Sequence, residues 1–102
     1  MAIFEISLIE NGKLFLEFVE RQNLRILNIS NKCTGVVTRD RIAGGNHEQS
    51  VIDYIVTCDS LADLLEEMMI DDERIHVLTK YSLKKRVKSD HNVMFAKFKN
   101  LN

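Results

Sequence analysis

An aspartate–histidine motif near the C-terminus is the feature of this chain most suggestive of chemistry. The tetrapeptide Ser-Asp-His-Asn at positions 89–92 leads directly into an alternating apolar stretch, residues 93–98. A second carboxylate, Asp53, interrupts the apolar run 51–56, 37 residues before Asp90. Aspartate is poorly suited to strand interiors and costly to bury without a partner, so Asp53 needs a specific partner or role. A carboxylate beside an imidazole at a strand edge is able to bind a metal ion or a phosphate.

Phosphodiester hydrolysis is a reaction in which these three side chains have complementary roles. The anionic oxygens of the substrate repel nucleophiles, so a catalyst supplies a divalent cation, an imidazole near the phosphorus and a group that orients that imidazole. Asp90, His91 and Asp53 are of the types that these three roles need. An aspartate that accepts one imidazole N–H fixes the tautomer of the ring. The alternative interpretation is a surface histidine ahead of an edge strand and a strand carboxylate satisfied by local backbone.

Basic side chains are concentrated near the C-terminal end. The 102 residues include 14 basic and 15 acidic side chains, for a formal net charge of −1, so the total charge does not indicate a polyanionic partner. Positions 59–73 contain acidic residues and no basic ones, whereas lysine and arginine crowd the positions after 79. A basic cluster beside Asp90 and His91 would suit a phosphate-bearing substrate, and a solvated loop is the equally weighted alternative. The candidate nucleic-acid-binding residues are Arg39, Lys84, Lys85, Arg86 and Lys88.

Composition indicates a single globular domain of modest stability, with 45% hydrophobic and 28% charged residues. Cys33 and Cys58 lack the spacing of a zinc site and are too few for a disulfide framework. We therefore expect an intracellular protein of the nucleus or cytoplasm rather than a secreted one. Residues 1–9 are apolar, but they contain Glu5 and lack a basic start. We expect neither a signal peptide nor a membrane-spanning segment.

Hydrophobic periodicity predicts two helices and five strands. Residues 11–23 have the spacing of an amphipathic helix, and residues 60–69 repeat leucine and methionine at i, i+3, i+4, i+7 and i+8, which predicts a second. The glycine-bearing stretch 39–49 reads as a loop, and 80–88 as a basic connection. The predicted strands are residues 24–29, 36–38, 50–57, 74–78 and 93–99.

These elements predict an α+β fold, in the order α-β-β-β-α-β-β. We expect a mixed, mostly antiparallel sheet with two helices on one face. Both faces of the strand 50–57 are largely apolar, so this strand is predicted to be central. An additional strand within residues 1–9 is an open alternative.

The order of these motifs resembles a known family. Residues 50–55 (Ser-Val-Ile-Asp-Tyr-Ile), a helix and a strand, and then Ser-Asp-His-Asn with a strand ending in Phe98 resemble the C-terminal half of the endonuclease/exonuclease/phosphatase superfamily. Within it, the chain is most similar to the endonuclease domains of non-LTR retrotransposons and their abasic-site endonuclease relatives. The resemblance covers residues 11–100 and includes Thr38-Arg39 in the family's order.

The resemblance implies a magnesium-dependent nuclease or phosphodiesterase that acts on nucleic acid, with DNA as the expected partner. It makes Asp53 the carboxylate that orients the histidine, Asp90 a metal-site carboxylate and His91 the imidazole beside the scissile phosphate. Ser50 and Ser89 would be supporting hydrogen-bonding residues.

The chain departs from the family's pattern where the metal is held. Family members carry, upstream of this region, an Asn and a Glu that bind the metal and a Gly-Asp-x-Asn strand, and none of these is present. The usual aromatic residue after the threonine equivalent to Thr38 is replaced by Arg39. We therefore interpret residues 1–102 as one truncated half-domain.

Two hypotheses follow from this truncation. The first is a nuclease-derived half-site that is inactive alone, because loss of a metal ligand removes charge stabilisation from the transition state. The second is a non-catalytic, dimeric binding or assembly module derived from a retroelement endonuclease. A half-domain would expose an apolar sheet face, which a homodimer, strand exchange or a missing N-terminal half-domain would cover.

Overall fold

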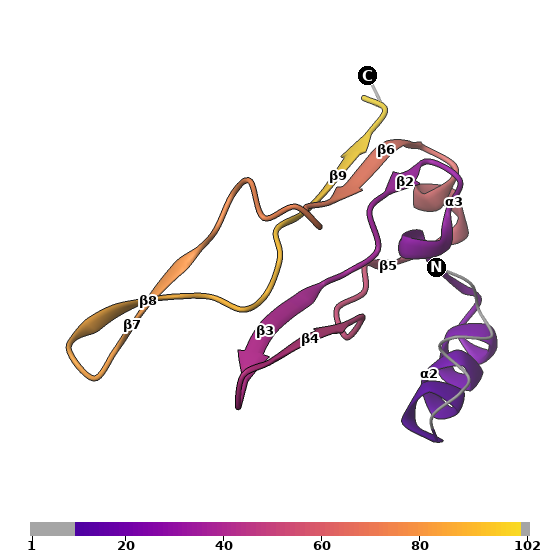
Figure 1. Cartoon of the computed structure of the whole chain (residues 1–102). Helices are drawn as coiled ribbons and strands as arrows, with labels where there is room; N and C mark the ends of the chain where they lie inside the picture. Colours follow the sequence, from indigo (N-terminus) through magenta and orange to yellow (C-terminus); the bar gives the residue numbers. More distant parts are fainter. Residues whose placement is uncertain (1–9, 101–102) are drawn as a thin grey trace. The chain divides into compact units, whose positions relative to one another are not determined.

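A computed structural model describes residues 10–100, and within them the chain separates into two compact units, each considered by itself (Figure 1). Unit 1 comprises the described residues among 1–33, 54–68 and 96–102, and unit 2 comprises residues 34–53 and 69–95. The possible N-terminal strand lies in residues 1–9, outside the described part. None of the helices within residues 10–100 is both long and apolar enough to cross a membrane.

Helix α2 (Glu10–Arg21) opens unit 1 and confirms the first predicted helix. Its inward face packs Val19, which is 8% exposed, against Ile26. The ring of Phe15 lies 4.9 Å from that of Tyr54, measured between centroids. Asn23 follows the helix with a φ of 54°, a left-handed conformation that asparagine tolerates well and that commonly ends helices.

A two-stranded antiparallel sheet pairs β1 (Leu24–Ile26) with β5 (Val56–Cys58). Residues Leu27–Ile29 form a 3₁₀ turn, so the predicted strand 24–29 is correct only in its first half. The predicted central strand 50–57 is wrong, because most of its residues precede β5 without strand pairing. In this segment the backbone amide of Ile55 donates a hydrogen bond to the side-chain oxygen of Asn28 rather than to a neighbouring strand.

The second predicted helix, residues 60–69, is correct only in its first turn. Only Asp59–Ala62 form a helical turn, α3, and the leucine- and methionine-bearing residues Leu65–Ile70 form strand β6. The backbone at and just before this strand is hydrogen-bonded to residues distant in the sequence: the Met68 amide donates to the Lys32 carbonyl and the Lys99 amide to the Leu64 carbonyl. These long-range bonds outweigh helix propensity, and an apolar stretch this short does not distinguish the two structures by periodicity.

Strand β6 is the middle strand of a sheet of order β2-β6-β9, with β2 (Cys33–Thr34) and β9 (Met94–Phe98). Strand β9 confirms the predicted strand 93–99. The predicted strand 36–38 is wrong, because the amides of Val36 and Val37 donate to the carboxylate of Asp72, at 2.9 and 2.6 Å, rather than to another strand.

Unit 2 contains two antiparallel hairpins. The first, β3 (Arg39–Ala43) and β4 (Asn46–Ser50), replaces the predicted loop 39–49. Gly44 and Gly45, with φ of 56° and 82°, make its two-residue turn, which requires two left-handed residues. The sequence of this hairpin is mostly polar, so it lacks the alternation of apolar and polar residues that would predict strands.

The second hairpin, β7 (Thr79–Ser82) and β8 (Lys85–Lys88), occupies the predicted basic connection. The predicted strand 74–78 is wrong, because strand pairing begins only after it, at Thr79. Within residues 10–100, two helices and a larger number of strands confirm the predicted α+β class. Instead of the single sheet predicted, the strands of residues 10–100 form four small sheets and are more numerous than predicted.

Candidate functional site

Asp53 and His91 meet in unit 2, although 38 positions separate them. The Nδ1 atom of His91 lies 2.7 Å from Oδ2 of Asp53. Because an ionised carboxylate only accepts hydrogen bonds, Nδ1 carries the proton. The His91 side chain is 46% exposed, and its other nitrogen, Nε2, lies 3.9 Å from Oδ1 of Asp90. The imidazole is thus held at one nitrogen while the other faces the second carboxylate.

Arg39 binds Asp90 on its other oxygen. The Arg39 Nε atom lies 3.0 Å from Oδ2 of Asp90, and this hydrogen bond holds the pKa of the carboxyl below its ordinary value. Backbone pairing keeps the two residues together, since the Asp40 amide donates to the Asp90 carbonyl and Arg39 forms a β-bridge with His91. Arg39, a candidate nucleic-acid contact in the sequence, is engaged with Asp90 in the structure.

The donor set around Asp90 does not fit a magnesium ion. Mg²⁺ takes near-octahedral oxygen coordination, commonly with carboxylates. One Asp90 oxygen is already bound by the Arg39 guanidinium. Across residues 10–100, no group of three or more His, Cys, Asp and Glu side chains is placed to hold a metal ion. Arg39 supplies the positive charge that Asp90 needs.

Thr38 positions the segment that carries Asp53. Its side chain is completely buried, at 0% exposure. The hydroxyl accepts the amide of Ile52 at 2.8 Å and that of Asp53 at 3.0 Å. In the sequence, the only sign of this role is a hydroxyl side chain directly after two valines, which did not predict it.

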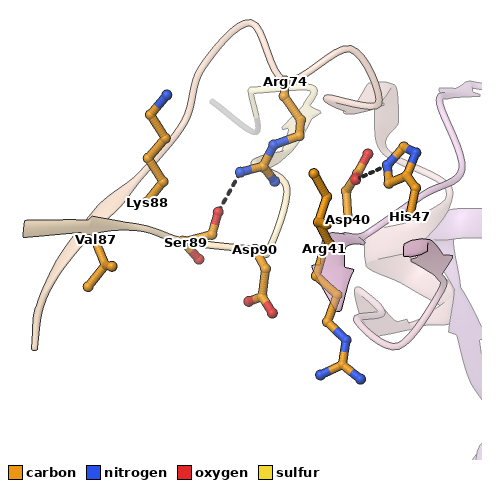
Figure 2. Close-up of a pocket in the computed structure, with 9 residues that line it drawn as sticks. Asp40, Arg41, His47, Arg74, Val87, Lys88, Ser89 and Asp90 are labelled. Carbon is orange, nitrogen blue, oxygen red and sulfur yellow. Dashed lines mark hydrogen bonds and ion pairs between the residues drawn. The ribbon is translucent and has the colours of Figure 1, made fainter. Parts of the chain in front are cut away.

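The loop 89–92 is held by its own polar side chains. The Ser89 hydroxyl accepts the His91 amide at 3.2 Å, and the Asn92 amide donates to the Thr38 carbonyl at 2.7 Å. Arg74 donates to the Asn92 side-chain oxygen at 2.8 Å and to the Ser89 carbonyl, the latter drawn in Figure 2. Arg74 and Asn92 were missed as positioning residues. Asn92 belongs to the tetrapeptide motif, whereas nothing in the sequence marked Arg74.

The remaining predicted residues take different places. Ser50 is the cross-strand partner of Arg39, and its carbonyl accepts the Thr38 amide at 3.1 Å. Ser50 therefore supports the site through its backbone. The basic residues are exposed on the second hairpin: Lys84 in its turn, and Lys85, Arg86 and Lys88 in β8.

A second acid–imidazole pair lies on the first hairpin. The Asp40 carboxylate binds Nε2 of His47 and accepts the Gln49 side-chain amide at 3.2 Å, and these bonds, that of Gln49 foremost, lower the pKa of Asp40. A cavity of about 690 Å³ beside the pair is also lined by Arg74 and Lys88. Asp90 also lines this cavity, and Figure 2 shows its carboxylate directed away from the Asp40–His47 pair.

Acidic groups alternate with an imidazole and a guanidinium in a row of four side chains, which runs Asp53, His91, Asp90, Arg39. In such a row, Nε2 of His91 is placed to donate a hydrogen bond to an anionic oxygen when both ring nitrogens carry a proton, and to accept a proton when Nε2 carries none. No protein-family model matches the chain, and comparison with curated proteins and with solved structures gives no significant match.

Proposed function

We propose that this chain carries the histidine side of a phosphodiesterase site of the endonuclease/exonuclease/phosphatase type, and that by itself it binds phosphodiesters of nucleic acid without hydrolysing them. The observation that carries this proposal is the 2.7 Å bond between Asp53 and Nδ1 of His91. With Nδ1–H bound to Asp53, a second proton on Nε2 makes an imidazolium that can donate a hydrogen bond to an anionic phosphodiester oxygen, and the Asp53 carboxylate offsets its positive charge.

Binding without hydrolysis follows from the charges around His91. Phosphodiester cleavage requires strong stabilisation of the negative charge that develops on the phosphoryl oxygens. Magnesium, which the resemblance implies, would supply that stabilisation, but the residues near Asp90 do not form a set that would hold it. Arg39, the cation beside the site, is already paired with Asp90.

A direct test monitors the three histidine rings by NMR while dimethyl phosphate, a phosphodiester without a base, is added. We expect the ring signals of His91 to shift and those of His76, a histidine of the same unit outside the site, to stay unchanged. Asp53→Asn should weaken the response several-fold, because a neutral amide no longer stabilises the imidazolium that donates to the phosphate oxygen. A response in which His76 and His91 shift equally would refute a specific site.

The second half of the proposal is tested with supercoiled plasmid and Mg²⁺. The chain should leave the plasmid intact. Nicking that is abolished by His91→Ala would show instead that the chain is a complete nuclease.

A second candidate function, a dimeric assembly module, is favoured by the outer face of α2. Leu14 and Phe18 lie one helical turn apart and are 57% and 54% exposed. Exposed apolar side chains at this spacing are typical of helix-mediated association. Sedimentation at micromolar concentration should then give a dimer that Phe18→Asp dissociates, and a monomer would exclude this function.

A further inference from the structure

The β7–β8 hairpin carries a cluster of exposed and unpaired cations. Lys84, Lys85, Arg86 and Lys88 are all exposed. None of them forms an ion pair with a carboxylate in the described part of the chain. Exposed cations that are not paired with carboxylates attract polyanions. The hairpin is thus a positively charged arm on a chain whose formal net charge is −1.

The strand register divides this arm into two faces. Tyr81 is the cross-strand partner of Arg86, so the two side chains lie on the same face. Because side chains alternate along a strand, Lys88 shares that face, while Lys85 and Val87 lie on the other. Figure 2 shows the Val87 and Lys88 side chains on opposite sides of the strand. One face therefore combines an aromatic ring with two cations.

Tyr81 is presented to solvent as a flat, accessible ring. The exposure of Tyr81 is 74%. Aromatic side chains flanked by cations bind unpaired nucleotides, since a base stacks on the ring while the cations contact phosphates. Two residues on one face of a strand lie about 6.8 Å apart, a spacing that allows Arg86 and Lys88 to contact successive phosphates of an extended strand.

We propose that the Tyr81–Arg86–Lys88 face of the β7–β8 hairpin binds single-stranded nucleic acid, with a base stacked on Tyr81 and the backbone phosphates on Arg86 and Lys88. The nature of the ligand rests on the proposed function, but the residues are different ones. In a duplex the base faces are covered by their neighbours, so Tyr81 favours the single strand. Lys88 lies two positions before Asp90, so a strand bound to this face extends toward the loop that carries His91.

The test is fluorescence anisotropy of the full chain with a labelled twelve-nucleotide single-stranded DNA at low salt. Tyr81→Ala should weaken binding about 5- to 150-fold, the range found when a stacking ring is removed, whereas Tyr81→Phe should bind as the unchanged protein does. Arg86→Ala should also reduce the slope of log affinity against log salt concentration by about 0.7. Lys85→Ala, which removes one cation from the opposite face, is the matched control and should have the smaller effect.

Several results would overturn the proposal. They are equal affinity of Tyr81→Ala and the unchanged protein, binding of the duplex as tight as that of the single strand, and displacement of the DNA by anionic phospholipid vesicles that bind through Tyr81. Tyr81→Ala separates this inference from the proposed function. It should weaken single-strand binding while the His91 ring still responds to dimethyl phosphate, and loss of strand binding in His91→Ala but not in Tyr81→Ala would refute the hairpin site alone.

Discussion

Replacing Thr38 by valine tests how the site is built, because valine keeps the shape of the side chain and removes its hydroxyl. The hydroxyl accepts two amides, those of Ile52 and Asp53, at 2.8 and 3.0 Å. A hydrogen bond contributes about 0.5–1.5 kcal/mol, and a buried donor left unpaired costs about 1–3 kcal/mol. Ile52 is 48% exposed, so its surroundings allow its amide to regain water more readily. We therefore expect Thr38→Val to lower the free energy of unfolding by about 2 kcal/mol.

Amide hydrogen exchange locates this loss. The amides of residues 52 and 53 should exchange about 30-fold faster in Thr38→Val, which is the equivalent of about 2 kcal/mol. Thr38→Ser is the control, since serine loses a methyl group but keeps the acceptor and should preserve both amides. Unchanged exchange at these two amides in Thr38→Val would refute the role assigned to the hydroxyl.

Three further predictions concern acid stability and the turns. The pKa values of Asp40, Asp71 and Asp90 lie below the ordinary 3.8. These ionised carboxyls therefore stabilise the fold fully above pH 3.8, and the stabilisation is lost as the pH falls through their lower folded pKa values. Acid unfolding followed by circular dichroism should be less steep in Asp71→Asn, and an unchanged curve would contradict this. Gly35→Ala should destabilise the chain more than Gly44→Ala in urea unfolding. Both glycines have positive φ, but a methyl group at Gly35 would lie 2.1 Å from the Ile70 carbonyl oxygen, whereas Gly44 faces open space. Equal losses of stability would argue against that clash. The turn residues Leu83 and Lys84 have φ of 50° and 63°, so Leu83→Asn with Lys84→Gly should raise the unfolding free energy by about 1–2 kcal/mol, and a loss would show that the turn is not strained.

The sequence predicted correctly those features that depend on local pattern. Helix α2 and strand β9 have clear periodicity, and the α+β class follows from the two element types. The proximity of Asp53 and His91 was expected from the resemblance, because their motifs occur in the family's order. Their contact at 2.7 Å agrees with that expectation, while their roles remain a proposal.

The errors occurred where distant partners decide the structure. The leucines and methionines of β6 have helical spacing, but hydrogen bonds to Lys32 and Lys99 hold that part of the chain as a strand. The segment 51–55 is apolar enough for a central strand, but hydroxyl and amide side chains accept its backbone N–H groups. The Arg39–Asp90 pair joins residues 51 positions apart, so no local pattern announced it.

The central claim is that Asp53 fixes the His91 imidazole with its proton on Nδ1 and leaves Nε2 facing the phosphodiester. The tautomer is measured directly from the ¹⁵N shifts and long-range ¹H–¹⁵N couplings of the histidine rings at alkaline pH. We expect His91 to be the Nδ1–H tautomer in the unchanged protein and to lose that preference in Asp53→Asn, while His76 is unaffected. A predominant Nε2–H tautomer in the unchanged protein, insensitive to Asp53→Asn, would contradict the account.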